Sequence, residues 1–355
     1  MQVRHDARLA ELTTLAVGGP IDRLVEVIDA AELVEAVRDA DESGRPLLLL
    51  GGGSNVIAPD AGWPGDVVVV RSRGVERNRG HLEVQAGEPW DDLVAYTVEQ
   101  QLAGMEAMAG IPGSTGATPV QNVGAYGQEV AQIITAVRVY DRLERVERTL
   151  SPAECGFAYR DSRLKREPGR FVVLSVGFAL DPGEHSRPVG YAELARRLGV
   201  ELGSTAPLAD VRAAVLELRR GKGMVLDPGD PDSRSAGSFF TNPIVPAARA
   251  VEGCPSWPAG DGLVKLSAAW LVQHAGFGRG TRNGHVGTSS RHSLALTTEP
   301  GATAEELIAF SERVVAAVRE RFGVTLEREP TVVAQPMTLS PYRATPRPTA
   351  VPRLP

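Results

Sequence analysis

The chain contains little cysteine and no pattern typical of a metal site. Cys155 and Cys254 are its only cysteines and lie far apart, which argues against a disulfide framework or a cysteine-ligated metal. The six histidines show no ligand spacing of the HExxH type. We therefore expect a protein without a structural metal.

Long apolar runs and blocks of basic charge are also missing. No stretch approaches the ~20 apolar residues that a membrane-spanning helix needs. Residues 1–19 lack the apolar run of a signal peptide. The formal charge of −6, without a Lys/Arg block, gives no sign of a nucleic-acid partner. We expect a soluble cytoplasmic protein that binds neither nucleic acid nor a membrane.

The size and composition are those of a globular protein with several domains. A chain of 355 residues is too long for one ordinary core, so we expect two or three domains. A hydrophobic content of 43% with 23% charged residues is typical of a folded, water-exposed protein.

A first glycine-rich segment follows directly from a predicted strand. Alternation over residues 21–28 predicts a strand, an apolar stripe over 30–43 predicts a helix, and residues 46–50 predict a buried strand. That strand runs into residues 51–55, Gly-Gly-Gly-Ser-Asn, whose successive backbone N–H groups could form an anion-binding nest. Neither the P-loop nor the Rossmann spacing is present. The segment is either a phosphate-binding turn of another kind or a plain turn.

A second glycine-rich segment covers residues 104–130, which are nearly free of charge. Its five glycines from Gly110 to Gly127 interrupt any helical or alternating period. Glycine leaves no Cβ in the way, so backbone can approach a ligand closely. Hydroxyl and amide side chains accompany the glycines and could bind a ligand rich in acceptors. The alternative is an ordinary glycine-rich connection.

Further elements follow from periodicity and capping signals. Thr303 and Glu306 form a capping box that opens a helix ending at Phe322. We expect residues from 337 onward to be disordered because they are rich in proline and lack a pattern. The other expected elements are strands at 66–71, 81–86, 136–140, 171–180, 294–297 and 324–333, helices at 90–101, 208–220 and 263–275, and a linker at 181–190.

Four segments without periodicity carry residues that could do chemistry. They hold Arg160 beside Tyr159, Ser238 before two phenylalanines, Asn242, and Glu329. Each has an ordinary alternative, because such residues usually face water or form turns. Their occurrence together with two glycine-rich segments favours a functional site.

The chain resembles the UDP-N-acetylenolpyruvoylglucosamine reductase (MurB) family over about residues 13–333. The resemblance lies in LLLLGGGSNVI, GIPGSTGATPVQNVGAYGQEV, YRDSRLK, SAGSFFTNP, KLSAAWLVQ and LEREP. It implies an α+β fold with an FAD-binding unit of the vanillyl-alcohol-oxidase (PCMH) type at about 16–182. The implied divisions are FAD-binding subdomains at 1–65 and 66–220, a substrate-binding domain at 221–322, a closing strand at 323–335 and a tail at 336–355.

The resemblance also implies roles for individual residues. Arg160, Ser238 and Glu329 match the catalytic positions, with Ser238 as the proton donor. Substrate-binding positions are Tyr159, Tyr191, Lys222, Asn242 and Ser293. FAD-binding positions are Gly51, Gly52, Gly53, Ser54, Asn55, Gly110, Ile111, Pro112, Gly113, Ser114, Gly116, Ala117, Gln121, Asn122, Gly124, Ala125 and Tyr126. Where some relatives carry a diphosphate-binding lysine this chain has Met224, so Lys222, Arg219 or Arg234 could substitute.

The implied reaction is an NADPH-dependent, FAD-mediated reduction of UDP-N-acetylglucosamine enolpyruvate to UDP-N-acetylmuramate. A guanidinium such as Arg160 suits the charge that develops on the substrate carboxylate. Ser238 can protonate the adjacent carbon if it lies within reach. An ionised Glu329 would repel that charge, so we expect either that burial raises its pKa or that it orients Arg160.

The resemblance leaves two other functions to be tested. An FAD-dependent oxidase of the same superfamily would pass electrons to oxygen, and a sensor of flavin or nucleotide sugar would bind without turnover. Oxidases of this kind often attach flavin through His or Cys, and His81 is the only histidine near a glycine-rich segment. We expect a monomeric reductase in which NADPH and the sugar nucleotide enter one pocket in turn.

Overall fold

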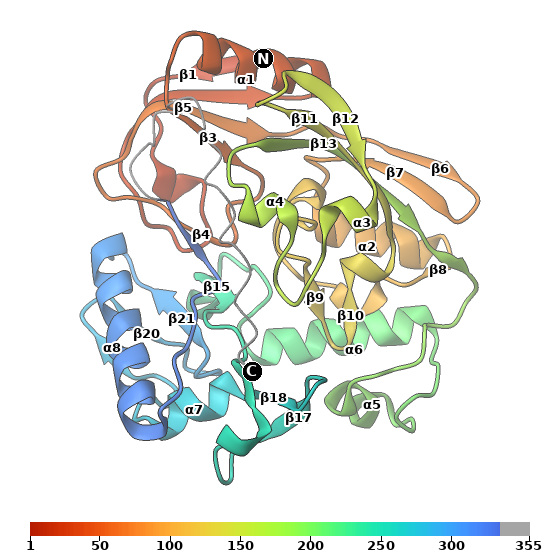
Figure 1. Cartoon of the computed structure of the whole chain (residues 1–355), viewed down its shortest axis with the longest axis vertical. Helices are drawn as coiled ribbons and strands as arrows, with labels where there is room; N and C mark the ends of the chain where they lie inside the picture. The colour runs from red at the N-terminus through yellow and green to blue at the C-terminus, as the bar shows by residue number, and fades with distance from the viewer. Residues whose placement is uncertain (334–355) are drawn as a thin grey trace, which may run out of the picture.

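The first part of the chain forms a four-stranded sheet in the order β1-β2-β5-β3. The computed structural model describes residues 1–333 (Figure 1). Three strands are parallel, and β1 is antiparallel to β2. The bounds are β1 Gln2–Arg4, β2 Ile21–Val27, β3 Leu47–Leu50 and β5 Trp63–Val70.

Helix α1, Ala30–Glu42, covers this sheet and has the predicted inward face. Leu33, Val34 and Val37 are buried, and the Asp29 side chain caps the helix by accepting from the Glu32 N–H. Leu47–Leu49 were expected to be buried, but they are only partly buried because β3 is an edge strand.

An antiparallel five-stranded sheet in the order β12-β11-β13-β7-β6 follows. Figure 1 shows it next to the first sheet, and side chains of both sheets share one core that includes Val68, Tyr140 and Leu174. Helices α2 and α6 contribute to the core on its other side, where Trp90 lies 6.2 Å from Phe178 between ring centroids. The bounds are β6 Val75–Asn78, β7 His81–Gln85, α2 Trp90–Glu99, β11 Ile134–Asp141, β12 Val146–Leu150, β13 Phe171–Ala179 and α6 Leu208–Gly221.

Short elements connect these larger ones. The segment expected as a linker at 181–190 begins with a strand that pairs with β8. The bounds are β8 Leu102–Ala103, β9 Gly124–Ala125, β10 Gln128–Glu129, α3 Pro152–Cys155, α4 Arg163–Arg166, β14 Asp181–Pro182 and α5 Ala192–Leu198. Single 3-10 turns lie at Leu9–Glu11, Glu106–Met108, Thr115–Ala117, Val130–Gln132, Pro231–Ser233 and Ala247–Arg249.

The last third of the described chain packs around Phe239, Phe240 and Phe310, in a core that also includes Leu15 and Ile57 of the first part. The expected capping box of Thr303 and Glu306 is present at the start of α8. The bounds are β15 Ser235–Ser238, β16 Ile244–Pro246, β17 Ser256–Pro258, β18 Leu263–Leu266, α7 Ala268–His274, β19 Arg282–Asn283, β20 Val286–Thr288, β21 Ala295–Thr298 and α8 Ala304–Phe322.

Two predictions in this region were wrong in extent. The helix expected at 263–275 begins only at Ala268, because residues 263–266 are the central strand β18 between β16 and β17. The side chain of Ser267 then caps α7 by accepting from the Trp270 N–H. The strand expected at 324–333 is reduced to β22, Thr331–Val332, and a single bridge between Phe240 and Arg328. The expected disordered tail lies outside the described residues.

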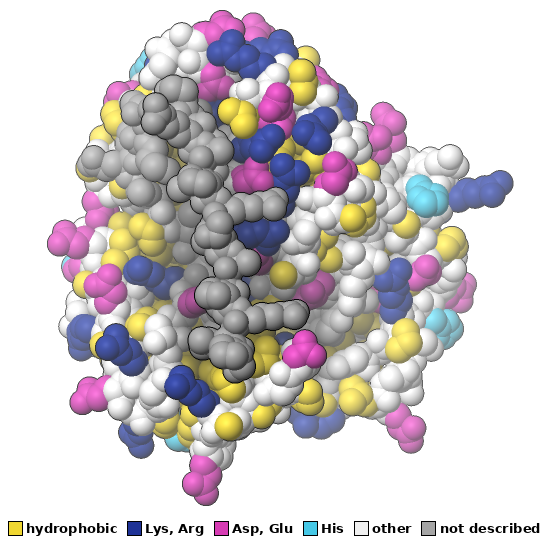
Figure 2. Space-filling view, in the orientation of Figure 1, with side chains coloured by type: hydrophobic (Ala, Val, Ile, Leu, Met, Phe, Trp, Pro, Cys, Tyr) yellow, Lys and Arg dark blue, Asp and Glu magenta, His cyan; other side chains and the backbone are white. Residues whose placement is uncertain are grey.

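Strand β22 joins the end of the described chain to its beginning. It pairs in parallel with β4, Val56–Ile57, directly after the first glycine-rich segment. On the face drawn in Figure 2, acidic and basic side chains alternate rather than forming one patch of a single sign. Within residues 1–333, no helix has both the length and the apolarity that crossing a membrane requires.

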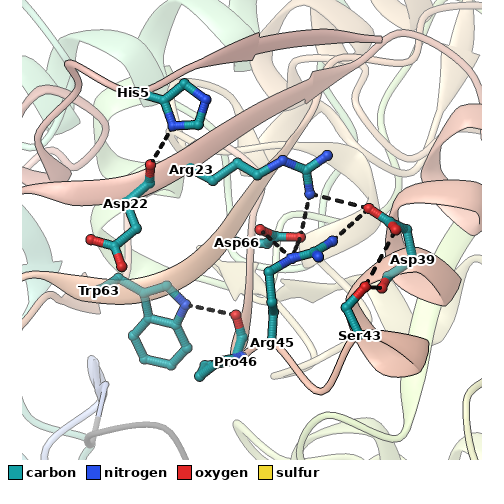
Figure 3. A network of polar contacts seen from close by, with 9 residues as sticks. All are labelled: His5, Asp22, Arg23, Asp39, Ser43, Arg45, Pro46, Trp63 and Asp66. Carbon is teal, nitrogen blue, oxygen red and sulfur yellow. Dashed lines mark hydrogen bonds and ion pairs between the residues drawn. The ribbon is translucent and has the colours of Figure 1, made fainter.

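A buried carboxylate, Asp66 of β5, anchors the end of the first sheet to α1. Arg23 and Arg45 both donate to it, at 2.7 and 3.2 Å, and Figure 3 shows both guanidinium groups also reaching Asp39 on α1. Ser43 completes the network through Asp39. The side chain of Asp66 is fully buried, whereas that of Asp39 is 47% exposed. The network therefore depends mainly on Asp66.

We predict that Asp66→Ala lowers the free energy of unfolding by about 3 kcal/mol, because it leaves two partly buried guanidinium groups without their shared partner. Asp39→Ala is the matched control and should cost less than about 1 kcal/mol, since its side chain is about half exposed and water screens its ion pairs. Urea unfolding of both variants measures the difference. Equal losses would show that burial of Asp66 has no special weight.

Candidate functional site

A cleft of about 330 Å³ lies where the two glycine-rich segments meet the last part of the chain. This volume is within the range of roughly 300–1,000 Å³ typical of small-molecule sites. Its walls come from residues 49–56, residues 111–124, the end of α6, the end of β15 and the segment around Glu329. Segments far apart in sequence therefore build one site.

The two glycine-rich segments touch backbone to backbone. A Cβ added to Gly52 would lie 2.6 Å from Gly113 Cα, and one added to Gly51 would lie 2.1 Å from Ser114 Oγ. The Ser54 hydroxyl donates to the Pro112 carbonyl at 2.8 Å, which holds the two segments together. Any larger residue at Gly52 would force the backbones apart, so glycine is required here by contact.

Most of the predicted FAD-binding residues line the cleft, but five do not. Those in the wall are Gly51–Asn55, Ile111, Pro112, Gly113, Ser114, Ala117, Gln121 and Gly124. Gly116 instead packs against Ala86, where an added Cβ would lie 2.5 Å from the Ala86 Cβ. The Asn122 side chain donates to the Ala158 carbonyl at 3.0 Å. Also outside the wall are Gly110, Ala125 and Tyr126.

Arg160 enters the cleft from a tight turn held by a bridge between Ala158 and Asp161. Its φ of +53° is unusual for a residue with a side chain. The guanidinium donates to the Gly124 carbonyl at 2.5 Å, and its Nε lies 3.2 Å from Glu329 Oε1. The second glycine-rich segment and Glu329 thus fix the direction of this cation.

Ser238 and Glu329 reach the cleft from neighbouring backbones. Ser238 ends β15, and the next residue, Phe239, accepts a hydrogen bond from the Glu329 N–H at 2.9 Å. Phe239 and Phe240 are almost fully buried, which anchors the end of β15 in the core. The cleft therefore contains all three predicted catalytic residues.

The five predicted substrate-binding residues lie outside the lining of this cleft. Tyr159 adjoins it, with its ring 5.3 Å from the Arg160 guanidinium and 4.8 Å from the Lys265 ammonium. Asn242 accepts from the Ala268 N–H at 2.9 Å, so it adds to the Ser267 cap at the start of α7. Ser293 donates to the Ala269 carbonyl at 3.2 Å.

The other two, Tyr191 and Lys222, belong to a separate cluster with Tyr126. The ring of Tyr191 meets that of Tyr126 edge-on at 5.3 Å, and the Lys222 ammonium lies 5.4 Å above the Tyr126 ring. Lys222 also pairs with Glu193 at 2.6 Å. Burial lowers the pKa of nearby His292 to about 4, so this histidine is neutral at physiological pH.

Sequence reasoning missed several residues of the wall. Lys165 lines the cleft, and its ammonium donates to the Arg160 carbonyl at 2.9 Å. Its place in YRDSRLK was a usable signal. Trp90 also lines it, although its sequence context indicated only a helix. Met224 lines it too, and was noted only as standing where some relatives carry a lysine. Arg219 was expected only as a possible substitute for the diphosphate-binding lysine, and the fold shows that it is buried in the wall.

The electrostatics of the cleft centre on Glu329. Burial raises the pKa of its carboxyl, and the cations Arg160 and Lys165 oppose that shift without cancelling it. The side chain is 15% exposed. Both alternatives expected from the sequence therefore have structural support: Glu329 is buried enough to hold a proton more tightly than usual, and it also contacts Arg160.

We predict that Glu329→Gln changes the pH dependence of stability. Because the folded-state pKa of Glu329 is raised, its contribution is fully present below the unfolded value near 4.5 and is lost as pH rises through the folded value. The unfolding free energy of the wild-type protein should therefore fall relative to that of the variant as pH rises above about 4.5. Urea unfolding at matched pH values tests this, and a constant difference would contradict it.

Comparison with known proteins gives matches over nearly the whole chain. Residues 21–149 match the family model of an FAD binding domain. Residues 230–333 match that of the UDP-N-acetylenolpyruvoylglucosamine reductase C-terminal domain. These two matches confirm the predicted fold class, an FAD-binding unit followed by a C-terminal α+β domain.

Curated relatives and a solved structure agree. The UDP-N-acetylenolpyruvoylglucosamine reductase of Streptomyces avermitilis is 51% identical, over 94% of this chain and 95% of its own. That of Streptomyces coelicolor is 52% identical, over 94% and 91%. The crystal structure of the Thermus caldophilus enzyme aligns with a TM-score of 0.66 at 26% identity, covering 94% of this chain and 99% of that one. The chain belongs to the UDP-N-acetylenolpyruvoylglucosamine reductase family.

Proposed function

We propose that this protein reduces UDP-N-acetylglucosamine enolpyruvate to UDP-N-acetylmuramate, using NADPH and FAD, in peptidoglycan precursor synthesis. One observation carries the proposal. In a chain about half identical to named reductases, a glycine-walled cleft brings together Arg160, Ser238 and Glu329. We also propose that it acts as a cytoplasmic monomer.

The residues of the cleft fit FAD. At Gly51 and Gly52, a Cβ would clash with the opposite segment, so only glycine lets the two segments close this wall of the cleft. Backbone N–H groups of residues 51–55 would hold the pyrophosphate, since such turns bind anions. The segment 111–114 would support the flavin. When bound, FAD supplies the hydride chemistry that the protein's own side chains lack.

Arg160 would bind the carboxylate of the enolpyruvyl group. Hydride addition to the terminal methylene moves negative charge toward that carboxylate, and a fixed guanidinium stabilises it. Arg160 is already held by Gly124 and Glu329, so little reorganisation is needed. A proton on Glu329 would remove a negative charge that repels the substrate carboxylate, and burial favours the protonated form of Glu329.

Ser238 would give its hydroxyl proton to the carbon next to the carboxylate. The double bond then gains one hydride and one proton, and the serine regains its proton from water, which balances the reduction. A hydroxyl is a weak acid, but a carbon that carries developing negative charge is a strong base. Residues Phe239 and Phe240 hold the serine at the end of β15 and keep the adjoining core dry.

The remaining assignments belong to the same proposal. The sugar nucleotide would be bound by Tyr159, Tyr191, Lys222, Asn242 and Ser293. Of these, Lys222 is the cation suited to bind its diphosphate. NADPH and the sugar nucleotide would use the cleft in turn. The FAD-binding unit would comprise residues 1–220 in two parts divided near residue 65, and the substrate domain residues 221–322, with 323–335 returning to the cleft.

We predict that Gly52→Ala weakens FAD binding about tenfold or more, roughly 1.4 kcal/mol, because its methyl group would press on the Gly113 backbone. Gly278→Ala is the control, since a Cβ there meets nothing within 4 Å. FAD titration of the two apoproteins, followed by absorbance, measures the difference. Equal affinities would mean that FAD does not use this glycine contact.

We predict that Ser238→Ala slows reduction of the enolpyruvyl sugar nucleotide by about 10²- to 10⁴-fold. Flavin binding and bleaching of the yellow colour by NADPH should stay intact, because the hydroxyl acts only on the sugar substrate. Stopped-flow absorbance separates the two half-reactions. A variant with altered stability alone would contradict the assignment, and peroxide formation without need of the sugar nucleotide would favour an oxidase.

A further inference from the structure

A buried arginine in the wall of the cleft has no role in the reaction as proposed above. Arg219 lies in the last turn of α6 and is 9% exposed. Its side chain lines the cleft, and one of its nitrogens, Nη2, donates to the Met224 carbonyl at 2.8 Å. Within the described residues 1–333, its Nε has no hydrogen-bond partner. A buried donor of this kind is costly unless a ligand completes it.

The positive charge of Arg219 is also poorly compensated. Burial lowers the pKa of Arg219. The two groups that act to raise this pKa are Tyr126 and Asp91. Burial raises the pKa of Tyr126 to about 12, so its hydroxyl is neutral at physiological pH. Asp91 is paired with Arg212 at 3.3 Å and accepts from the Gly110 N–H at 2.6 Å. The site therefore favours a ligand that brings negative charge.

The surroundings of Arg219 favour a flat ring over a diphosphate. The same wall contains the largely apolar side chains of Trp90, Ile111 and Met224. A diphosphate carries several strongly hydrated oxygens that need several donors or water. A ring carbonyl next to a ring nitrogen needs only one or two donors and tolerates apolar neighbours.

We propose that Arg219 donates to the pyrimidine edge of the flavin, the carbonyl and nitrogen that gain negative charge when the cofactor is reduced. This proposal rests on the proposed FAD site. Arg219 would then stabilise the reduced cofactor more than the oxidised one, and so raise its reduction potential. The site is already charged and desolvated before the cofactor binds, so its field is preorganised.

The test compares Arg219→Met and Arg219→Lys with Arg212→Met. Arg212 is a matched control, because it lies on the same helix, also has a buried Nε without a partner in residues 1–333, and is ion-paired outside the cleft. Reduction potentials are measured by equilibration with reference dyes, in excess FAD so that weaker binding does not empty the site. Thermal unfolding monitors folding, and steady-state kinetics gives KM for the sugar nucleotide.

We expect Arg219→Met to shift the balance toward the oxidised cofactor by tenfold or more, which is about 30 mV for a two-electron couple. Arg219→Lys should lie between Arg219→Met and wild type, and Arg212→Met should match wild type in potential. An unchanged potential in Arg219→Met overturns the inference. If KM for the sugar nucleotide then rises, Arg219 binds an anionic group of the substrate. If only the melting temperature falls, the role of Arg219 is structural. A wild-type protein that binds no FAD would instead refute the proposed function.

Discussion

The cleft depends on a close backbone contact that only glycine allows. Gly52 and Gly113 approach so closely that a Cβ on Gly52 would lie 2.6 Å from the facing Cα. The hydrogen bond from Ser54 to the Pro112 carbonyl fixes this approach. Glycine loses more conformational freedom on folding than other residues, so the segment needs such fixed contacts to be ordered. The wall that results offers a ligand backbone groups but few side chains, and reactive side chains must come from elsewhere.

Those side chains arrive through long-range pairing. The Glu329 N–H donates to the Phe239 carbonyl and the Thr331 N–H donates to the Asn55 carbonyl, so one short segment joins the end of β15 to the first glycine-rich segment. Strand β22 then pairs with β4. The arrangement of the proposed catalytic residues is consequently not a property of either half of the chain alone. It exists only when the last described segment is docked, which couples formation of the site to folding of the whole.

Local signals predicted most elements, whereas contacts decided the rest. The capping box at Thr303 and the stripe of α1 are encoded within a few residues, and both were predicted correctly. The strand at residues 263–266 was mistaken for helix because no turn signal separates it from the helical pattern that follows. Pairing with β16 on one side and β17 on the other makes these residues a strand. The glycine-rich segments and Arg160 were identifiable by composition and motif. Burial of Arg219 depends on where the end of α6 packs, which periodicity cannot show.

The charge of the cleft is opposite to that of the whole chain. The formal charge is −6, yet the wall contains the cations Arg160, Lys165 and Arg219 and one carboxylate, Glu329, whose pKa is raised by burial. Salt screening limits the range over which exposed charges interact to about 8–10 Å at physiological ionic strength, whereas charges inside a cleft interact with a bound ligand at contact distance. The positive charge that this cleft offers to an anion is therefore a local property of its wall. An anion bound beside Glu329 would increase its proton affinity further, because each negative charge disfavours the other. Anion binding and proton uptake are then linked, and each must strengthen the other by the same factor.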